Sequence, residues 1–262
     1  MDAETLLLHS MGQNRAWLLG HWEDVASDRF RDEFRILINR RAAGEPLQYI
    51  TGEAEFYGLP FRVAPGVLIP RPETEHLVEE VLRLAKTFVK PRIVDLGTGS
   101  GAIAVALAHS LPGAQLVATD LSEGALAIAF NNSQRNQVAD RIEFIAGDLL
   151  APLVGRSFEI IASNPPYIPL GDGDSLSVEV REYEPHLALF AGVDGLEVYR
   201  RLIPQAWELL VADGWLVMEI GYGQQAAIEI LLLASGYSEI DFVADYQGIP
   251  RVALGQRRSL RE

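Results

Sequence analysis

Hydrophobic positions divide the chain into a helical beginning, a short strand-like stretch and a long alternating region. Up to about residue 43, apolar residues recur among charged ones at helical spacing, which predicts a small helical region. Residues 50–69 resemble two short strands that turn at residues 58–60, which predicts a hairpin. A new apolar stripe then predicts a helix from about Thr74 to Phe88, with Thr74 as its N-cap.

From Arg92 onward, strand-type and helix-type segments alternate, which is typical of a mainly parallel sheet covered on both faces. The seven predicted strands are 93–96, 115–119, 142–146, 158–163, 215–220, 240–243 and 252–256. The four predicted helices between them are 101–109, 124–134, 196–210 and 224–233. No helix separates the last two strands, so we expect an antiparallel hairpin at one sheet edge. This pattern predicts an α/β fold, the seven-stranded doubly wound, Rossmann-like sheet of methyltransferases.

Composition excludes several classes of function. Hydrophobic residues make up 48% of the chain, but no apolar run approaches the roughly 20 residues of a membrane-spanning helix. We therefore expect no membrane partner and a cytoplasmic location. The chain has no Cys, and its five His show no ligand spacing, so no metal is expected. A net charge of −14 makes direct binding to nucleic acid unfavourable.

A glycine-rich loop follows the first predicted strand of the sheet. It reads Gly97-Thr98-Gly99-Ser100-Gly101 and comes shortly after Asp95. Such glycines let backbone N–H groups approach a ligand, and the following helix N-terminus favours its negative end. The spacing favours S-adenosylmethionine, whose amino acid part offers an ammonium group to an acid and a carboxylate to N–H groups. NAD binding and a purely structural role for the glycines are the alternatives.

Polar side chains also end the next three strands. Asp120 lies roughly 20 residues after the loop, where a carboxylate can accept both ribose hydroxyls. Asp148 can accept the exocyclic amine of an adenine, and Asn164 follows the fourth strand. Because the carboxyl ends of parallel strands share one sheet edge, these residues predict one ligand site. The predicted cofactor is S-adenosyl-L-methionine, with S-adenosyl-L-homocysteine as its product.

The stretch Asn164-Pro165-Pro166-Tyr167 predicts the place of the reaction. Two prolines fix two φ angles and remove two backbone donors, which leaves carbonyl acceptors in a rigid cup beside an Asn and a Tyr. A planar NH2 group fits, because the Asn164 side-chain oxygen and the Pro165 carbonyl can accept its two hydrogens while the Tyr167 ring packs on its plane. This predicts methyl transfer to nitrogen. A proline-rich turn at a strand end is the simpler alternative.

Several segments together resemble the release-factor glutamine methyltransferases (the HemK/PrmC family) across essentially the full length. The glycine loop and Asn-Pro-Pro-Tyr are shared with many aminomethyltransferases, whereas Arg71-Pro72-Glu73-Thr74-Glu75 with the helical beginning is more specific. The matching segments are 46–52, 56–58, 69–75, 95–101, 164–167, 184–192 and 195–196.

The resemblance implies methyl transfer to the side-chain nitrogen (N5) of the Gln in the Gly-Gly-Gln motif of peptide chain release factors. It also implies a five-helix N-terminal domain that helps to grip the release factor. We expect a helical recognition domain over 1–49, a β-hairpin linker over 50–73 and the methyltransferase domain over 74–262, in a monomer.

Carried over by position, the resemblance assigns site residues. Some relatives have an aromatic residue where Leu149 stands, so aliphatic packing would replace ring stacking on adenine. Arg71, with Glu73 and Glu75, would close the site over the substrate, or would only start a helix. Cofactor contacts would be Gly97, Thr98, Gly99, Ser100, Gly101, Asp120, Leu149 and Asn164, and substrate contacts Asn164, Pro165, Pro166 and Tyr167.

Two rival functions remain open at this stage. A nucleic acid amino-methyltransferase acting on adenine N6 or guanine N2 could use the same cup for a flipped base. It would need a basic groove or a recognition insert, and residues 168–195 are too few and too acidic to form one. The other rival is an NAD-binding or non-enzymatic module, in which Asn164 to Tyr167 would be turn chemistry only.

Overall fold

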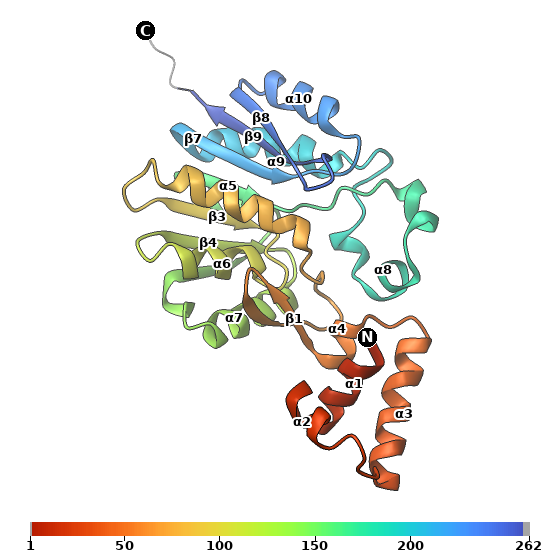
Figure 1. Cartoon of the computed structure of the whole chain (residues 1–262). Helices are drawn as coiled ribbons and strands as arrows, with labels where there is room; N and C mark the ends of the chain where they lie inside the picture. Colours follow the sequence, from red (N-terminus) through yellow and green to blue (C-terminus); the bar gives the residue numbers. More distant parts are fainter. Residues whose placement is uncertain (1, 259–262) are drawn as a thin grey trace.

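The computed structural model describes residues 2–258, and its N-terminal helices form a lobe at one end of the molecule (Figure 1). Asn14 and Ser27 cap the second and third helices with side-chain oxygens, which accept from Trp17 N and Phe30 N. The described part of this lobe has four helices, one fewer than the resemblance implies. They are α1 (Asp2–Met11), α2 (Arg15–Gly20), α3 (Asp28–Ala42) and α4 (Leu47–Thr51).

The hairpin after the lobe is confirmed, but its turn begins one residue earlier than predicted and has two residues in place of three. Strand β1 (Glu53–Phe56) pairs antiparallel with β2 (Leu59–Arg62), so Pro60 is inside a strand. The turn residues are Tyr57 and Gly58, with φ of 53° and 71°. Positive φ at both positions gives a two-residue turn whose twist matches that of the flanking strands.

The predicted sheet is confirmed, with strand order β5-β4-β3-β6-β7-β9-β8. Neighbours from β5 to β7 are parallel, and β9 enters antiparallel between β7 and β8. The strands are β3 (Arg92–Leu96), β4 (Gln115–Asp120), β5 (Ile142–Ala146), β6 (Phe158–Ser163), β7 (Leu210–Glu219), β8 (Ser238–Ala244) and β9 (Pro250–Arg257). The helices that accompany it are α5 (Glu75–Ala85), α6 (Ala102–Ser110), α7 (Glu123–Arg135), α9 (Glu197–Leu209) and α10 (Gln225–Ala234).

Two hydrophobic layers cover the sheet, because successive strand side chains point to opposite faces. Ile93 and Ile160 pack with the buried residues of α5 and α6, whereas Val94 and Ile161 pack with those of α9 and α10. Helix α6 lies deepest, since residues 102–108 are all buried. The paired layers hold the carboxyl ends of β3, β4, β6 and β7 at one rim, as the sequence predicts.

The segment between β6 and α9, where the sequence predicts no helix or strand, contains three short helical elements. It contains η4 (Leu170–Ser175), α8 (Val178–Tyr183) and η5 (His186–Ala188), and Ile168 bridges to Phe190. This insertion, residues 164–196, reaches the N-terminal lobe in Figure 1. The contact is specific, since Arg41 Nη2 lies 2.6 Å from Glu179 Oε1 and Tyr183 donates to the Ala43 carbonyl. Short 3-10 turns elsewhere are η1 (Pro72–Thr74), η2 (Ala139–Arg141) and η3 (Ala151–Leu153).

Within residues 2–258 there is no helix that combines the length and the apolar character needed to cross a membrane. In the same range, no three His, Cys, Asp or Glu side chains gather in a way that could hold a metal ion.

Candidate methyl-transfer site

The glycine loop between β3 and α6 has the backbone that its sequence requires. Gly97, Gly99 and Gly101 have φ of 69°, 55° and 81°, a region that side chains disfavour. A Cβ on Gly101 would lie 2.9 Å from the Ala129 Cβ, so this glycine lets α7 pack closely. At Gly97 and Gly99, by contrast, a Cβ would meet no heavy atom of the described chain within 4 Å. The first two glycines therefore border open space at the sheet rim.

Asp95 lies buried beneath this loop. Its Oδ2 accepts from Thr98 Oγ1 at 2.6 Å and from Ala104 N at 3.0 Å, while Oδ1 has no hydrogen-bond partner among residues 2–258. Burial raises the pKa of the carboxyl group to about 6. A carboxylate with one unused acceptor beside a backbone cradle suits a ligand that carries an ammonium group.

Asp120 ends β4 next to the same loop. Its Oδ2 accepts from Gly99 N at 2.9 Å, and its Oδ1 accepts from Ser122 N at 2.8 Å. These bonds fix the carboxylate on the rim, and each oxygen keeps a further lone pair for a hydroxyl group. The structure thus brings Asp120 and the glycine loop together.

Asp148 and Leu149 follow β5 and have surroundings that the sequence did not indicate. Asp148 forms an ion pair with Arg201 from α9. Leu149 has φ of 50° and packs against the layer beneath α9 and α10. An adenine amine at Asp148 would therefore share the carboxylate with Arg201.

At the cup, the side chains of Asn164 and Tyr167 converge on one buried carboxylate. Asn164 Nδ2 donates to Thr74 Oγ1 at 3.1 Å, and Thr74 Oγ1 donates to Glu219 Oε2 at 2.6 Å. Tyr167 donates its hydroxyl hydrogen to Glu219 Oε1 at 3.3 Å. Thr74 occupies the predicted N-cap position of α5, but its side chain makes no capping bond to the helix and donates to Glu219 instead.

Glu219, the last residue of β7, was missed by the sequence analysis. It is 2% exposed, and burial raises the pKa of its carboxyl group to about 7 against the opposing hydrogen bonds from Thr74 and Tyr167. Tyr199 from α9 donates to its backbone carbonyl at 2.7 Å. The sequence offered one signal for this site, an acidic residue at the end of a buried strand. Its partners Thr74 and Tyr167 lie 145 and 52 positions earlier in the chain, so no local pattern connects them with Glu219.

The backbone of the cup is held from its far side by Gln224. Its Nε2 donates to the Tyr167 carbonyl at 2.9 Å and to the Gly195 carbonyl at 3.3 Å. A Cβ on Gly195 would lie 2.3 Å from the Tyr167 carbonyl oxygen, and one on Gly221 would lie 3.0 Å from the Tyr167 ring. These two glycines allow the close packing that orients the ring.

Arg71, a predicted substrate contact, pairs with Glu184 at the end of α8. The Glu184 side chain is 1% exposed and also accepts from Ile69 N at 3.3 Å. Nearby, Glu75 Oε1 accepts from Tyr57 N at 2.8 Å and ties the start of α5 to the hairpin turn. The Arg71 segment therefore joins the hairpin region to the insertion beside the cup.

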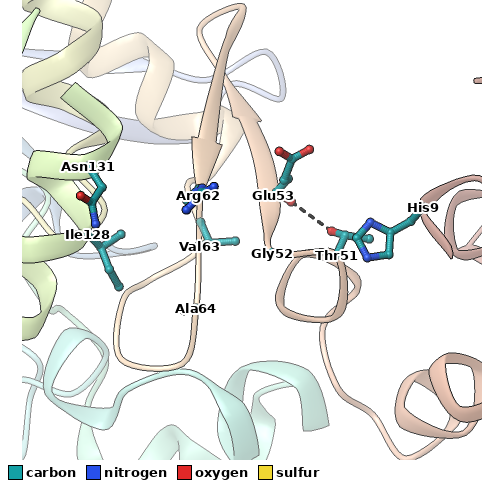
Figure 2. A pocket seen from close by; sticks show the side chains of 9 residues that line it. All are labelled: His9, Thr51, Gly52, Glu53, Arg62, Val63, Ala64, Ile128 and Asn131. Atoms are coloured by element: carbon teal, nitrogen blue, oxygen red, sulfur yellow. Dashed lines mark hydrogen bonds between the residues drawn. The ribbon is translucent and has the colours of Figure 1, made fainter. Parts of the chain in front are cut away.

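A separate hollow of about 610 Å³ lies between the N-terminal lobe, the hairpin and α7. Figure 2 shows His9 from α1, Thr51 from α4, Arg62 from β2 and Ile128 and Asn131 from α7 around it. None of the predicted site residues lines this hollow, so the glycine loop and the cup remain the candidate site.

Comparisons with known proteins agree with this fold. The family model described as "PrmC N-terminal domain" matches residues 1–52, and "Methyltransferase small domain" matches residues 74–178. Among solved structures, a methyltransferase from Pyrococcus furiosus is 19% identical with a TM-score of 0.57, covering 87% of this chain and 99% of that one. A ribosomal protein L11 methylase from Lactobacillus delbrueckii subsp. bulgaricus is 25% identical with a TM-score of 0.52, covering 72% and 81%.

The sheet order shows the fold of a methyltransferase, and the matched methyltransferase domain together with full-length relatives at 42–44% identity defines the chain as one. A release factor glutamine methyltransferase from Koribacter versatilis is 42% identical over 98% of this chain and 91% of its own. One from Moorella thermoacetica is 44% identical over 98% and 91%. The chain belongs to the release factor glutamine methyltransferase family.

Proposed function

We infer that the protein transfers a methyl group from S-adenosylmethionine to the side-chain amide nitrogen, N5, of the Gln in the Gly-Gly-Gln motif of peptide chain release factors. The observation that carries this inference is the cup: Asn164 donates through Nδ2 to Thr74, and no residue in 2–258 donates to its Oδ1. An amide oxygen with a fixed direction and an unused lone pair is what an N–H2 substrate requires. The names of the full-length relatives agree with an amide substrate.

The loop residues fit the methyl donor. Backbone N–H groups of residues 97–101 would hold its carboxylate, and the buried Asp95 beneath the loop, whose Oδ1 has no partner within residues 2–258, would supply negative charge for its ammonium group. Asp120 would accept from the ribose hydroxyls, and Leu149 and Asp148 would border the adenine. When bound, S-adenosylmethionine supplies an electrophilic methyl group on a sulfonium.

The residues of the cup would position the substrate amide. Its nitrogen is a weak nucleophile, because the lone pair is delocalised into the carbonyl. Asn164 Oδ1 and the Pro165 carbonyl would accept its two hydrogens, keep electron density on nitrogen and aim it at the methyl group, while Tyr167 packs on the amide plane. Pro166 stiffens the cup, and Arg71 would help to close the site. No dedicated base is needed, since the proton can leave as positive charge develops on nitrogen.

The remaining parts are assigned accordingly. Residues 1–49 would grip the release factor, and residues 74–262 would carry out the methyl transfer. Residues 50–73 would link these two domains. The enzyme would be monomeric and cytoplasmic. The pair between Arg41 and Glu179 supports joint action of the lobe and the insertion.

The test is incubation with S-adenosylmethionine labelled on its methyl group and with purified release factor, DNA and rRNA in separate reactions. We expect label on the release factor alone, and peptide mapping should place it on the Gln side chain of the Gly-Gly-Gln motif. Label on a nucleobase would refute this function and support the nucleic acid rival. Binding of NAD in place of S-adenosylmethionine by calorimetry would refute both.

A further inference from the structure

We propose that Thr74 and Glu219 form a polarity relay, which fixes the direction of the Asn164 carboxamide so that its oxygen faces the substrate nitrogen. This inference rests on the proposed function and deepens it. Thr74 and Glu219 are positioning residues here, because they act on the substrate through Asn164. The relay joins three distant segments of the chain: the start of α5, the end of β6 and the end of β7.

The direction of the Asn164 carboxamide follows from the number of hydrogens that Thr74 and Glu219 can donate. An ionised carboxylate only accepts hydrogen bonds, so the one hydroxyl hydrogen of Thr74 is committed to Glu219 Oε2. The Thr74 oxygen then offers only lone pairs to Asn164. It can accept from Nδ2 but cannot donate to Oδ1, and a carboxamide turned by 180° would place oxygen against oxygen. Oδ1 is thereby left facing away from Thr74.

Burial of Thr74 and Glu219 makes the reversed direction of the Asn164 carboxamide unfavourable. Thr74 is 4% exposed and Glu219 is 2% exposed, so water cannot supply a replacement hydrogen at low cost. The same carboxylate accepts from Tyr167, which couples the ring of the cup to the relay. A wrongly directed Asn164 would present an N–H2 group to the N–H2 group of the substrate, and the cup would lose its acceptor.

The first test compares two changes at Thr74. Thr74→Val keeps the shape of the side chain and removes the hydroxyl, so we expect kcat to fall about tenfold to a hundredfold, the effect of losing one preorganised contact or less. KM for the release factor and the Kd for S-adenosylmethionine should stay within about threefold, because those contacts remain. Thr74→Ser restores the hydroxyl and should restore kcat.

The matched control is Ser133→Ala, which removes a buried hydroxyl that donates to the Phe130 carbonyl on α7, far from the cup in sequence. It should leave kcat unchanged and cost only stability. The relay is wrong if Thr74→Val keeps wild-type kcat, or if Thr74→Ser loses as much activity as Thr74→Val.

The second test uses pH to change the protonation of the Glu219 carboxylate, which leaves the shape of the side chain unchanged. A protonated Glu219 can donate to Thr74, which frees the Thr74 hydrogen for Asn164 Oδ1 and reverses the amide. Since burial raises the pKa of Glu219 to about 7, wild-type kcat should rise with pH through this region. The groups that face Glu219 are Tyr167 and Tyr199, whose pKa values are raised, together with Arg251, which favours the ionised form, and Glu73, which opposes it.

Glu219→Gln removes the titration while keeping the size of the side chain. Its carboxamide can lie in two directions, so kcat should be a few-fold lower and should no longer rise between about pH 6 and pH 8. An unchanged pH profile in Glu219→Gln would overturn the relay.

Failure of the relay and failure of the proposed function give different results. If the wild type methylates no release factor, the proposed function fails. The relay is then decided by neutron crystal structures of the wild type and Thr74→Val, in which the deuterium atoms on Nδ2 distinguish it from Oδ1. A carboxamide that keeps its direction without the Thr74 hydroxyl refutes the relay, and one that turns or takes two directions supports it.

Discussion

At the scale of single residues, Asn164 is the side chain on which the proposed reaction depends most. Asn164→Ala removes the acceptor for the substrate N–H and should lower kcat roughly 10²–10³-fold, as expected for one preorganised polar contact. Single-turnover assays with release factor measure this directly. Asn136→Ala, at the half-buried C-terminal end of α7, is the control and should keep wild-type turnover. Near-normal turnover of Asn164→Ala would remove this residue from the reaction.

Asp95 gives a prediction about stability and pH. Its pKa is raised from 3.8 to about 6, so the folded state binds the proton more tightly than the unfolded state does. The contribution of Asp95 to stability is therefore largest below about pH 4 and is lost as pH rises towards 6. The unfolding free energy of wild type minus that of Asp95→Asn should fall by about 2–3 kcal/mol from pH 4 to pH 7. Urea titrations at several pH values measure it, and a constant difference would contradict the prediction.

The sequence could predict the residues whose role lies in their local spacing. Gly97 to Gly101 and Asn164 to Tyr167 are contiguous, and their special backbones follow from Gly and Pro alone. Thr74 and Glu219 could not be found this way, because their meaning depends on meeting across 145 positions. For the same reason, nothing local to Asp148 indicated its pairing with Arg201.

At the scale of elements, Asn132 on α7 connects three segments. Its Oδ1 accepts from Arg62 N at 2.7 Å, and its Nδ2 donates to the carbonyls of Arg62 at 2.9 Å and Ser100 at 2.8 Å. The side chain is fully buried, so water cannot replace these bonds. It joins the end of the hairpin to the glycine loop.

Asn132→Ala should therefore lower the unfolding free energy by about 2–4 kcal/mol, because it leaves buried backbone groups unpaired. It should also weaken binding of S-adenosylmethionine, since Ser100 belongs to the loop. Urea unfolding and calorimetry provide the two measurements. Asn131→Ala, one position away and exposed, should change neither. Equal effects of the two variants would show that these bonds do not matter.

The strands of the sheet and the helices that cover it were predictable, because their buried apolar residues recur with the period of a strand or of a helix. The bounds of β5 and β6 agree with the prediction at both ends, and α6, α7, α9 and α10 each differ from it by one residue at either end. Helix α5 ends three residues earlier than predicted, and β7 begins five residues earlier. The insertion was not predictable in this way. Residues 178–183 of α8 are half-buried or exposed, so they lack the apolar stripe that reveals a longer helix.

At the scale of the whole molecule, the pair of Arg71 and Glu184 joins the hairpin region to the insertion. Glu184→Ala would leave the Ile69 N–H and the Arg71 guanidinium without their partner, and should cost about 2–4 kcal/mol of unfolding free energy. KM for the release factor should rise, because the insertion borders the cup.

The control for this change is Glu179→Ala on the same insertion. It breaks the more exposed pair with Arg41 and should cost less than about 1 kcal/mol. Thermal and urea unfolding of both variants, with KM for the release factor, check the prediction. A smaller loss for Glu184→Ala than for Glu179→Ala would contradict it.

The position of β9 also bears on how the chain matures. A strand from residues 250–257 fills the space between β7 and β8, so neither neighbour has its final partner until those residues arrive. A copy whose synthesis stops after residue 244 would expose two unpaired strand edges and lack Arg251, which favours the charged form of Glu219. Such unfinished copies should aggregate with one another, which makes their early removal by proteolysis advantageous to the cell.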